Sequence, residues 1–104
     1  MIILTDANFE EAIKTPGKPI IVDIYAEWCP PCKMLGPIME KLDLDYGDKV
    51  TFAKMNLDEN RVTGNALSVD VIPTVFLYVD GQIKSSFTGF RQEDEIKQWI
   101  NTNI

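Results

Sequence analysis

Histidine is absent from this sequence of 104 residues, and cysteine occurs only twice. Without histidine, the chain cannot carry a Cys-His protease site, histidine-based acid catalysis or a zinc site with histidine ligands. Two thiols are also too few for a closed tetrahedral zinc site or for a disulfide-rich scaffold. We therefore predict no metal site, and the chemistry of the chain is to be sought at the cysteines.

Basic residues are also scarce, because ten Lys and Arg stand against sixteen Asp and Glu and give a net charge of −6. This balance argues against nucleic acid or anionic lipid as the main partner. Long apolar runs are missing as well. Met1-Ile2-Ile3-Leu4 is followed at once by Thr5-Asp6, so this segment has no basic region and no apolar run long enough for a signal peptide or a membrane span. We expect a cytoplasmic monomer with no nucleic-acid or membrane partner, and an exported location if a signal segment has been removed.

The remaining composition is that of an ordinary globular protein, with 45% apolar residues and no repeat or low-complexity tract. Its length corresponds to a single domain over residues 1–104. The patterning predicts strands over 2–4, 20–26, 50–56, 74–79 and 83–88, helices over 5–14, 31–46 and 91–101, and a short helix or turn over 60–67. Asp6 or Asn8 is the expected cap of the first helix, and Asp80-Gly81 the two-residue turn of a hairpin. The order β-α-β-α-β-α-β-β-α predicts an α/β protein with a mixed central β-sheet flanked by helices on both faces.

Both cysteines lie in the segment Trp-Cys-Pro-Pro-Cys-Lys at positions 28–33. If a helix begins here, Cys29 and Cys32 share one face at a spacing of roughly 5 to 6 Å between Cβ atoms, close to what a disulfide needs. Each proline disfavours helical torsions in the residue before it. We therefore expect Cys29 and Pro30 to be extended and Pro31 to be the first helical residue.

This geometry makes the two thiols unequal. Cys29 stands exposed at the positive end of the helix, where unpaired N–H groups favour its anion, and it is the predicted nucleophile. Cys32 lies inside the first turn, stays protonated longer and is predicted to attack Cys29 and release a bound product.

Asp23 interrupts an otherwise apolar predicted strand. A buried carboxylate is costly unless it is paired, and its usual response is a raised pKa. Near a thiol, such a group can take the proton that Cys32 has to lose, and Lys54 is the predicted countercharge if its strand lies next to that of Asp23. A structural ion pair retained for packing is the alternative interpretation.

Pro73, in Ile72-Pro73-Thr74, stands at the mouth of a predicted strand. A proline there marks either a sheet edge or a cis peptide in a tight turn. Trp28 sits beside the predicted nucleophile at the exposed end of a helix, and we expect it to be a contact residue. Met34 and Met39 are expected to fill the core.

Together these residues resemble the thioredoxin family, and the resemblance extends over essentially the whole chain. It is carried by Asp23-Ile-Tyr-Ala-Glu-Trp-Cys-Pro-Pro-Cys-Lys33, Pro37, Ala53-Lys-Met-Asn-Leu-Asp58, Ile72-Pro-Thr74 and Gly89. It implies a thioredoxin fold and a protein thiol-disulfide oxidoreductase, in which Cys29 attacks a disulfide of a partner protein, Cys32 resolves the mixed disulfide, and Asp23 with Lys54 handles the proton.

The resemblance also implies a cis Pro73 facing the dithiol and a backbone at Ile72 that pairs with the substrate chain. The contact surface that it implies consists of Trp28, Pro30, Val71, Ile72, Gly89 and Phe90. A flavin-dependent reductase of the thioredoxin-reductase type would regenerate the dithiol, and no cofactor would be bound besides the redox-active disulfide.

The sequence departs from the family pattern at Pro30, where glycine is usual, and at Tyr25, where Trp or Phe is usual. Pro30 removes a backbone donor and stiffens the loop, so the direction of electron flow is left open. An oxidase or isomerase of an exported compartment is one alternative, although no histidine lies between the cysteines. A binding module with a dispensable dithiol is another.

Overall fold

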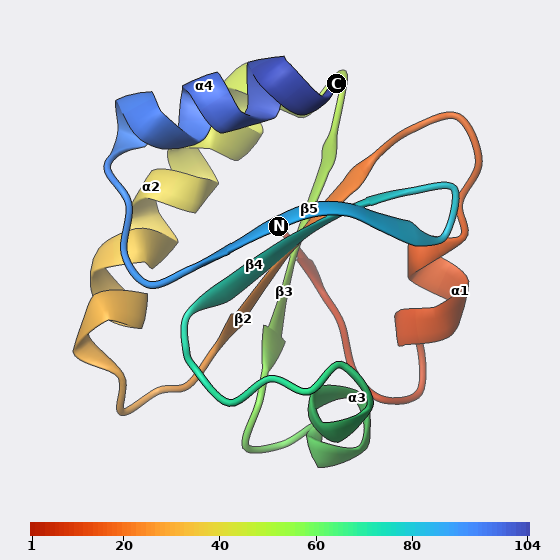
Figure 1. Cartoon of the computed structure of the whole chain (residues 1–104), viewed down its shortest axis with the longest axis vertical. Coiled ribbons are helices and arrows are strands. Elements are labelled where there is room, and N and C mark those ends of the chain that lie inside the picture. The colour runs from red at the N-terminus through yellow and green to blue at the C-terminus, as the bar shows by residue number, and fades with distance from the viewer.

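A five-stranded sheet forms the centre of the fold (Figure 1). The computed structural model describes all residues 1–104. Its elements run β1 (Ile2–Ile3), α1 (Phe9–Ile13), β2 (Ile20–Tyr25), α2 (Pro30–Tyr46), β3 (Thr51–Asn56), α3 (Arg61–Ala66), β4 (Thr74–Val79), β5 (Gln82–Thr88) and α4 (Glu93–Asn103). This is the predicted element order, and most boundaries differ from the prediction by one to three residues.

The strands are arranged in the order β1-β3-β2-β4-β5. β3 pairs in parallel with both β1 and β2, whereas β4 pairs antiparallel with β2 and β5, so the predicted mixed sheet is confirmed. Asp80 and Gly81 close the β4–β5 hairpin with φ angles of 52° and 82°. Two successive positive φ angles match the right-handed twist of the flanking strands.

Alternation along the strands divides the core into two layers. In β2, Ile21 faces one layer while Ile20, Val22 and Ile24 face the other. Figure 1 shows α2 and α4 together on one side of the sheet and α1 on the other. The α2 layer contains Ile21, Leu35, Met39, Leu42, Val50, Phe52, Val75, Leu77, Phe87, Ile96 and Ile100. By parity, Asp23 shares the face of Ile21 and therefore lies beneath α2.

The N-terminal segment is held differently from the prediction. Asn8 occupies the N-cap position of α1 but makes no side-chain cap hydrogen bond. Asp6 instead caps α3: its Oδ1 accepts from the backbone N–H of Thr63 at 2.8 Å, and its own N–H donates to Asn60 Oδ1 at 2.8 Å. Hydrogen bonds from Thr63 hold the pKa of Asp6 below its ordinary value. This cap spans 57 residues, which is why local sequence patterning assigned it to the wrong helix.

Candidate active site

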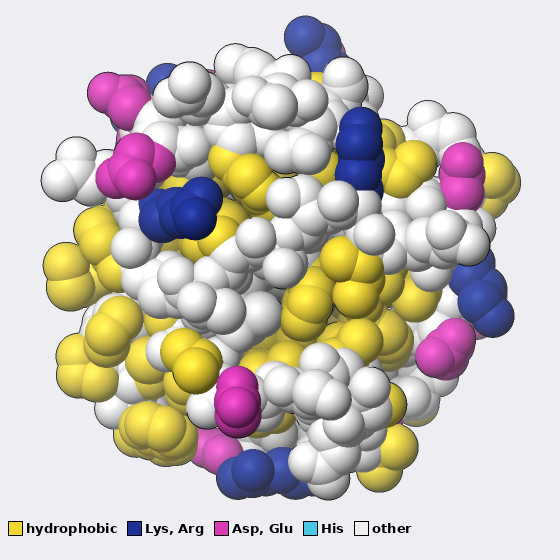
Figure 2. All heavy atoms as spheres, viewed as in Figure 1, with side chains coloured by type: hydrophobic (Ala, Val, Ile, Leu, Met, Phe, Trp, Pro, Cys, Tyr) yellow, Lys and Arg dark blue, Asp and Glu magenta, His cyan; other side chains and the backbone are white.

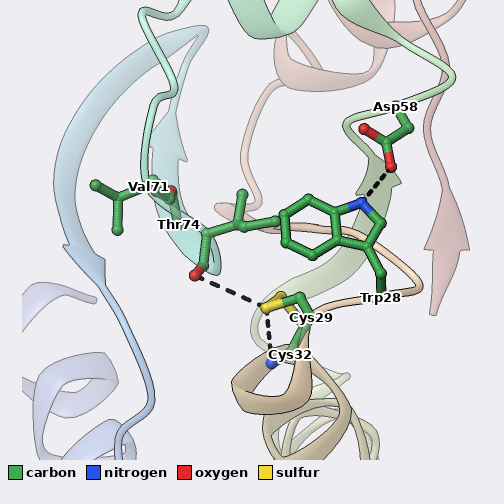
Figure 3. Close-up of a disulfide and its surroundings, with 7 residues drawn as sticks. Trp28, Cys29, Cys32, Asp58, Val71 and Thr74 are labelled. Atoms are coloured by element: carbon green, nitrogen blue, oxygen red, sulfur yellow. Dashed lines mark hydrogen bonds between the residues drawn. A yellow bond between two sulfur atoms is a disulfide. The ribbon is translucent and has the colours of Figure 1, made fainter.

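Cys29 and Cys32 form a disulfide at the start of α2, with their Cα atoms 5.2 Å apart (Figure 3). Cys29 is the N-cap residue in extended conformation, with φ −94° and ψ 108°, as predicted. The helix begins at Pro30 rather than at Pro31, so the expectation that Pro30 is extended is wrong. Both prolines occupy the first turn, where backbone N–H groups have no helical partner, so neither removes a hydrogen bond.

The two sulfur atoms differ in their hydrogen bonding. The backbone N–H of Cys32 points back to Sγ of Cys29 at 3.3 Å, in the manner of an N-cap. A donor aimed at this sulfur favours a thiolate there. The exposed fractions are 3% for Cys29 and 5% for Cys32, so the expectation that Cys29 is the exposed thiol is wrong. The asymmetry arises from the helix terminus and not from solvent access.

The segment before β4 closes over the disulfide. The Ile72–Pro73 peptide bond is cis, and the carbonyl oxygen of Ile72 lies 3.8 Å from Sγ of Cys29. The hydroxyl of Thr74 donates to the carbonyl of Val71 and closes the turn. On the far side of the turn, the N–H of Gly89 donates to the carbonyl of Pro73 at 2.8 Å. These contacts bring the predicted segments around positions 29, 72 and 89 together.

Asp23 lies opposite Lys54 in the parallel β2–β3 pair, so the predicted proximity of the two residues is confirmed. No ion pair joins them at contact distance, and Oδ1 of Asp23 has no hydrogen-bond partner in the protein although the residue is 96% buried. Burial raises the pKa of Asp23 to about 7, partly offset by the positive charge of Lys54. The ammonium group of Lys54 lies 5.9 Å from the centre of the Tyr25 ring.

A cavity of about 190 Å³ connects these groups. Asp23, Lys54 and Cys32 line it together with residues of α2 and the segment before it. Because a water molecule takes roughly 30 Å³ of liquid volume, the cavity is large enough for water to bridge the carboxyl group and the thiol. The site therefore places a group that titrates near neutral pH beside the second cysteine.

Apolar side chains are exposed around the disulfide. In Figure 2 they gather at the lower left, over the start of α2 and the segment before β4. Trp28 is 66% exposed, and Val71 and Phe90 are also exposed. Met34 belongs to this exposed set as well, so its expected place in the core is wrong, whereas Met39 is fully buried as predicted. Leu35, Met39 and Leu42 define the buried stripe of α2, and Met34 lies outside it.

Trp28 is attached to a network that the sequence patterning missed. Its indole Nε1–H donates to Oδ2 of Asp58 at 2.7 Å, and Oδ1 of Asp58 accepts from Nη2 of Arg61 at 2.8 Å. The pairing of two strands in the folded sheet accounts for this contact. β2 and β3 are parallel neighbours, so the residues that follow Tyr25 and those that follow Asn56 emerge at the same edge of the sheet.

The structure contains no group of three or more His, Cys, Asp or Glu side chains placed to hold a metal ion. No helix combines the length and the apolar character that a membrane crossing requires.

The disulfide caps a helix and lies beside a cis-proline, with a buried carboxyl group nearby. This arrangement defines the class of proteins that carry out thiol–disulfide exchange. A family model described as Thioredoxin matches residues 1–102. The chain is 42% identical to a thioredoxin of Rickettsia bellii over 97% of this chain and 96% of that protein. It is 38% identical to a thioredoxin of Rhodospirillum rubrum (97% of each chain) and 36% identical to one of Pseudomonas aeruginosa (97% of this chain and 94% of that protein).

The chain belongs to the thioredoxin family. The mixed sheet flanked by helices is the predicted thioredoxin fold. The protein is accordingly a protein thiol-disulfide oxidoreductase, and its redox-active centre is the disulfide between Cys29 and Cys32.

Proposed function

We propose that this protein reduces disulfides in partner proteins, with Cys29 as the nucleophile. The supporting observation is the N-cap geometry: Sγ of Cys29 receives the N–H of Cys32 and faces the segment that ends at the cis-proline. In the reduced form, the Cys29 thiolate attacks one sulfur of a partner disulfide. A mixed disulfide forms, the partner's disulfide bond breaks, and the departing partner thiolate takes up a proton.

Cys32 completes the exchange. Asp23 accepts the proton of the Cys32 thiol across the cavity that both residues line. The Cys32 thiolate then attacks Sγ of Cys29, the intramolecular disulfide forms, and the second partner sulfur leaves as a thiolate and is protonated. Two electrons have passed to the partner, and Asp23 holds a proton that it can return. A pKa of about 7 suits this role, because proton transfer is efficient when the pKa of the base lies near the working pH.

The surface around the disulfide is the proposed docking site for partner proteins. Its members are the apolar or backbone-presenting residues at the meeting point of three segments, namely Trp28, Pro30, Val71, Ile72, Gly89 and Phe90. The backbone at Ile72 would pair with an extended substrate segment, and Pro73 would face the dithiol and keep that backbone beside Cys29.

Membership of the family supports the remaining assignments. We propose a single domain over residues 1–104 that acts in the cytoplasm as a monomer. A flavoenzyme of the thioredoxin-reductase type would return it to the dithiol form, with no cofactor bound to this chain.

Trapping of the mixed disulfide tests the assignment of the two cysteines. Cys32→Ser should accumulate disulfide-linked adducts with partner proteins, because Cys29 attacks and nothing resolves the product. Cys29→Ser should form none, and the double variant serves as the background control. Equal trapping by the two single variants would overturn the assignment.

Equilibration with a series of glutathione buffers tests the direction of electron flow. A potential below that of the cytosolic glutathione pool supports the reductase, and each 30 mV corresponds to about 1.4 kcal/mol for this two-electron couple. A potential well above the pool would contradict it.

A further inference from the structure

The indole of Trp28 is both strongly exposed and firmly held. It is 66% exposed, yet its Nε1–H donates to Asp58 at 2.7 Å (Figure 3). A large exposed side chain normally samples several rotamers, and ordering it on binding costs free energy. The hydrogen bond removes much of that cost before a partner arrives.

Asp58 is in turn oriented by two further contacts. Its Oδ1 accepts from Nη2 of Arg61 at 2.8 Å in an ion pair, which leaves Oδ2 directed at the indole. Its backbone N–H donates to Oδ1 of Asn56 at 2.9 Å. Both oxygens of the carboxylate are thus engaged, one by a cation and one by the ring of Trp28.

The backbone that carries Arg61 is itself held by hydrogen bonds. It is the first residue of α3, and the segment before it is tied down because Asn60 bonds the N–H of Asp6 and the carbonyl of Asn56. The side chain of Arg61 is 66% exposed, and its one ion pair is with Asp58. No hydrogen bond joins it to either cysteine.

We propose that Arg61 is a positioning residue for exchange with protein disulfides: it holds the Asp58 carboxylate, which holds the indole of Trp28 against the docking surface. This inference rests on the proposed contact role of Trp28. Arg61 acts on the docking of a folded partner and not on the sulfur chemistry, because it reaches the disulfide only through two other side chains. Its removal therefore raises KM for a protein disulfide and leaves kcat and the reaction with a small disulfide unchanged.

The test compares Arg61→Met and Arg61→Lys with the natural protein. Lys14→Met is the matched control, because Lys14 is equally exposed, at 67%, and forms a surface ion pair with Glu10 far from the disulfide. The substrates are insulin, as a disulfide-bonded protein, and a symmetric aromatic disulfide of low mass. Arg61→Met should lower kcat/KM for insulin about two- to five-fold, the range of one exposed ion pair, through KM. Arg61→Lys should restore most of the loss, and Lys14→Met should leave both rates unchanged.

The NMR signals of the indole N–H groups test directly whether Arg61 positions Trp28. In Arg61→Met, the Trp28 signal should shift and its exchange with solvent should accelerate. The Trp99 signal should not move, because that indole donates to Ser85 elsewhere in the fold.

Three outcomes would overturn the proposal. If Trp28→Ala reduces insulin as well as the natural protein does, the contact role of Trp28 fails, and with it the role of Arg61. If Trp28→Ala is impaired but Arg61→Met is not, the positioning role alone fails. Equal losses with insulin and the small disulfide would place Arg61 in the chemistry and contradict the proposed separation.

Discussion

Replacement of Asp23 by Asn should change how the stability of the protein depends on pH. Asp23 is almost completely buried, and one of its oxygens has no partner in the protein. Burial raises its pKa from 3.8 to about 7, against the opposing influence of Lys54. The folded state therefore binds a proton that the unfolded state has already released at every pH between these values.

The sign and size of the effect follow from proton linkage. Between pH 3.8 and about 7, the folded state holds one more proton than the unfolded state, so the free energy of unfolding falls by about 1.4 kcal/mol for each pH unit. The favourable contribution of the buried, protonated Asp23 to stability is fully present below pH 3.8 and is lost as the pH rises to about 7. Over the whole interval the loss is about 4 kcal/mol. Asn cannot ionise, so the stability of Asp23→Asn relative to that of the natural protein should rise by an amount of this order between pH 4 and pH 8.

Urea unfolding of the two oxidised proteins at intervals from pH 4 to pH 8.5, followed by near-ultraviolet circular dichroism, measures the effect. The difference between the two free energies of unfolding is the relevant quantity, because other titrating groups cancel and any constant cost of burying an amide only displaces the curve. The difference should rise with pH and level off above pH 7.

Lys54→Met provides the control. Loss of the positive charge removes the one influence that lowers the pKa of Asp23. The fall in stability should therefore begin at the same pH but continue to a higher pH in this background. A difference between Asp23→Asn and the natural protein that stays constant from pH 4 to pH 8.5 would refute the reasoning, since it would mean that Asp23 titrates alike in the folded and unfolded chains.

Two further predictions concern helix ends. Asp6→Ala should lower the free energy of unfolding by about 1 kcal/mol, because the cap of α3 at Thr63 is lost. Asn8→Ala removes no helix cap and should lower it by less. Equal losses of the two variants in urea unfolding would contradict the assignment of the cap. Gly47→Ala should also destabilise the protein, by about 1 kcal/mol or more. A Cβ atom at this position would lie 2.5 Å from the carbonyl oxygen of Asp43. An unchanged urea midpoint would contradict this prediction and show that the end of α2 moves away without cost.

The fold was predictable from the sequence wherever a pattern is local. The apolar run of β2, the helical spacing in α2 and the Asp80-Gly81 turn each specify their own element, and the structure confirms them. Tertiary context decided the rest. Pro30 is helical although the proline that follows it disfavours helical torsions, and the missing N–H groups of the two prolines cost no hydrogen bond in the first turn.

The same distinction between local patterns and tertiary contacts applies to the active site. Cys29, Cys32 and Asp23 carry chemistry in their side chains, so their residue types and spacing were informative. The network from Arg61 through Asp58 to Trp28 joins two loops 30 residues apart, and no spacing rule covers such a contact. The cap from Asp6 to Thr63 was missed for the same reason. Contacts between loops depend on which strands are neighbours, and this arrangement emerges only in the folded sheet.

The placement of Asp23 in β2 also bears on how the sheet assembles. Side chains alternate between faces, so a slip of one residue against the neighbouring strands would send every β2 side chain to the opposite layer. Asp23 would then enter the layer of Val22 and Ile24, where buried apolar side chains such as Phe9 and Met55 pack together. A carboxyl group stranded there would cost several kcal/mol. The residue that lowers the stability of the native state at neutral pH thus penalises the misaligned sheet still more, and so helps to select a single register.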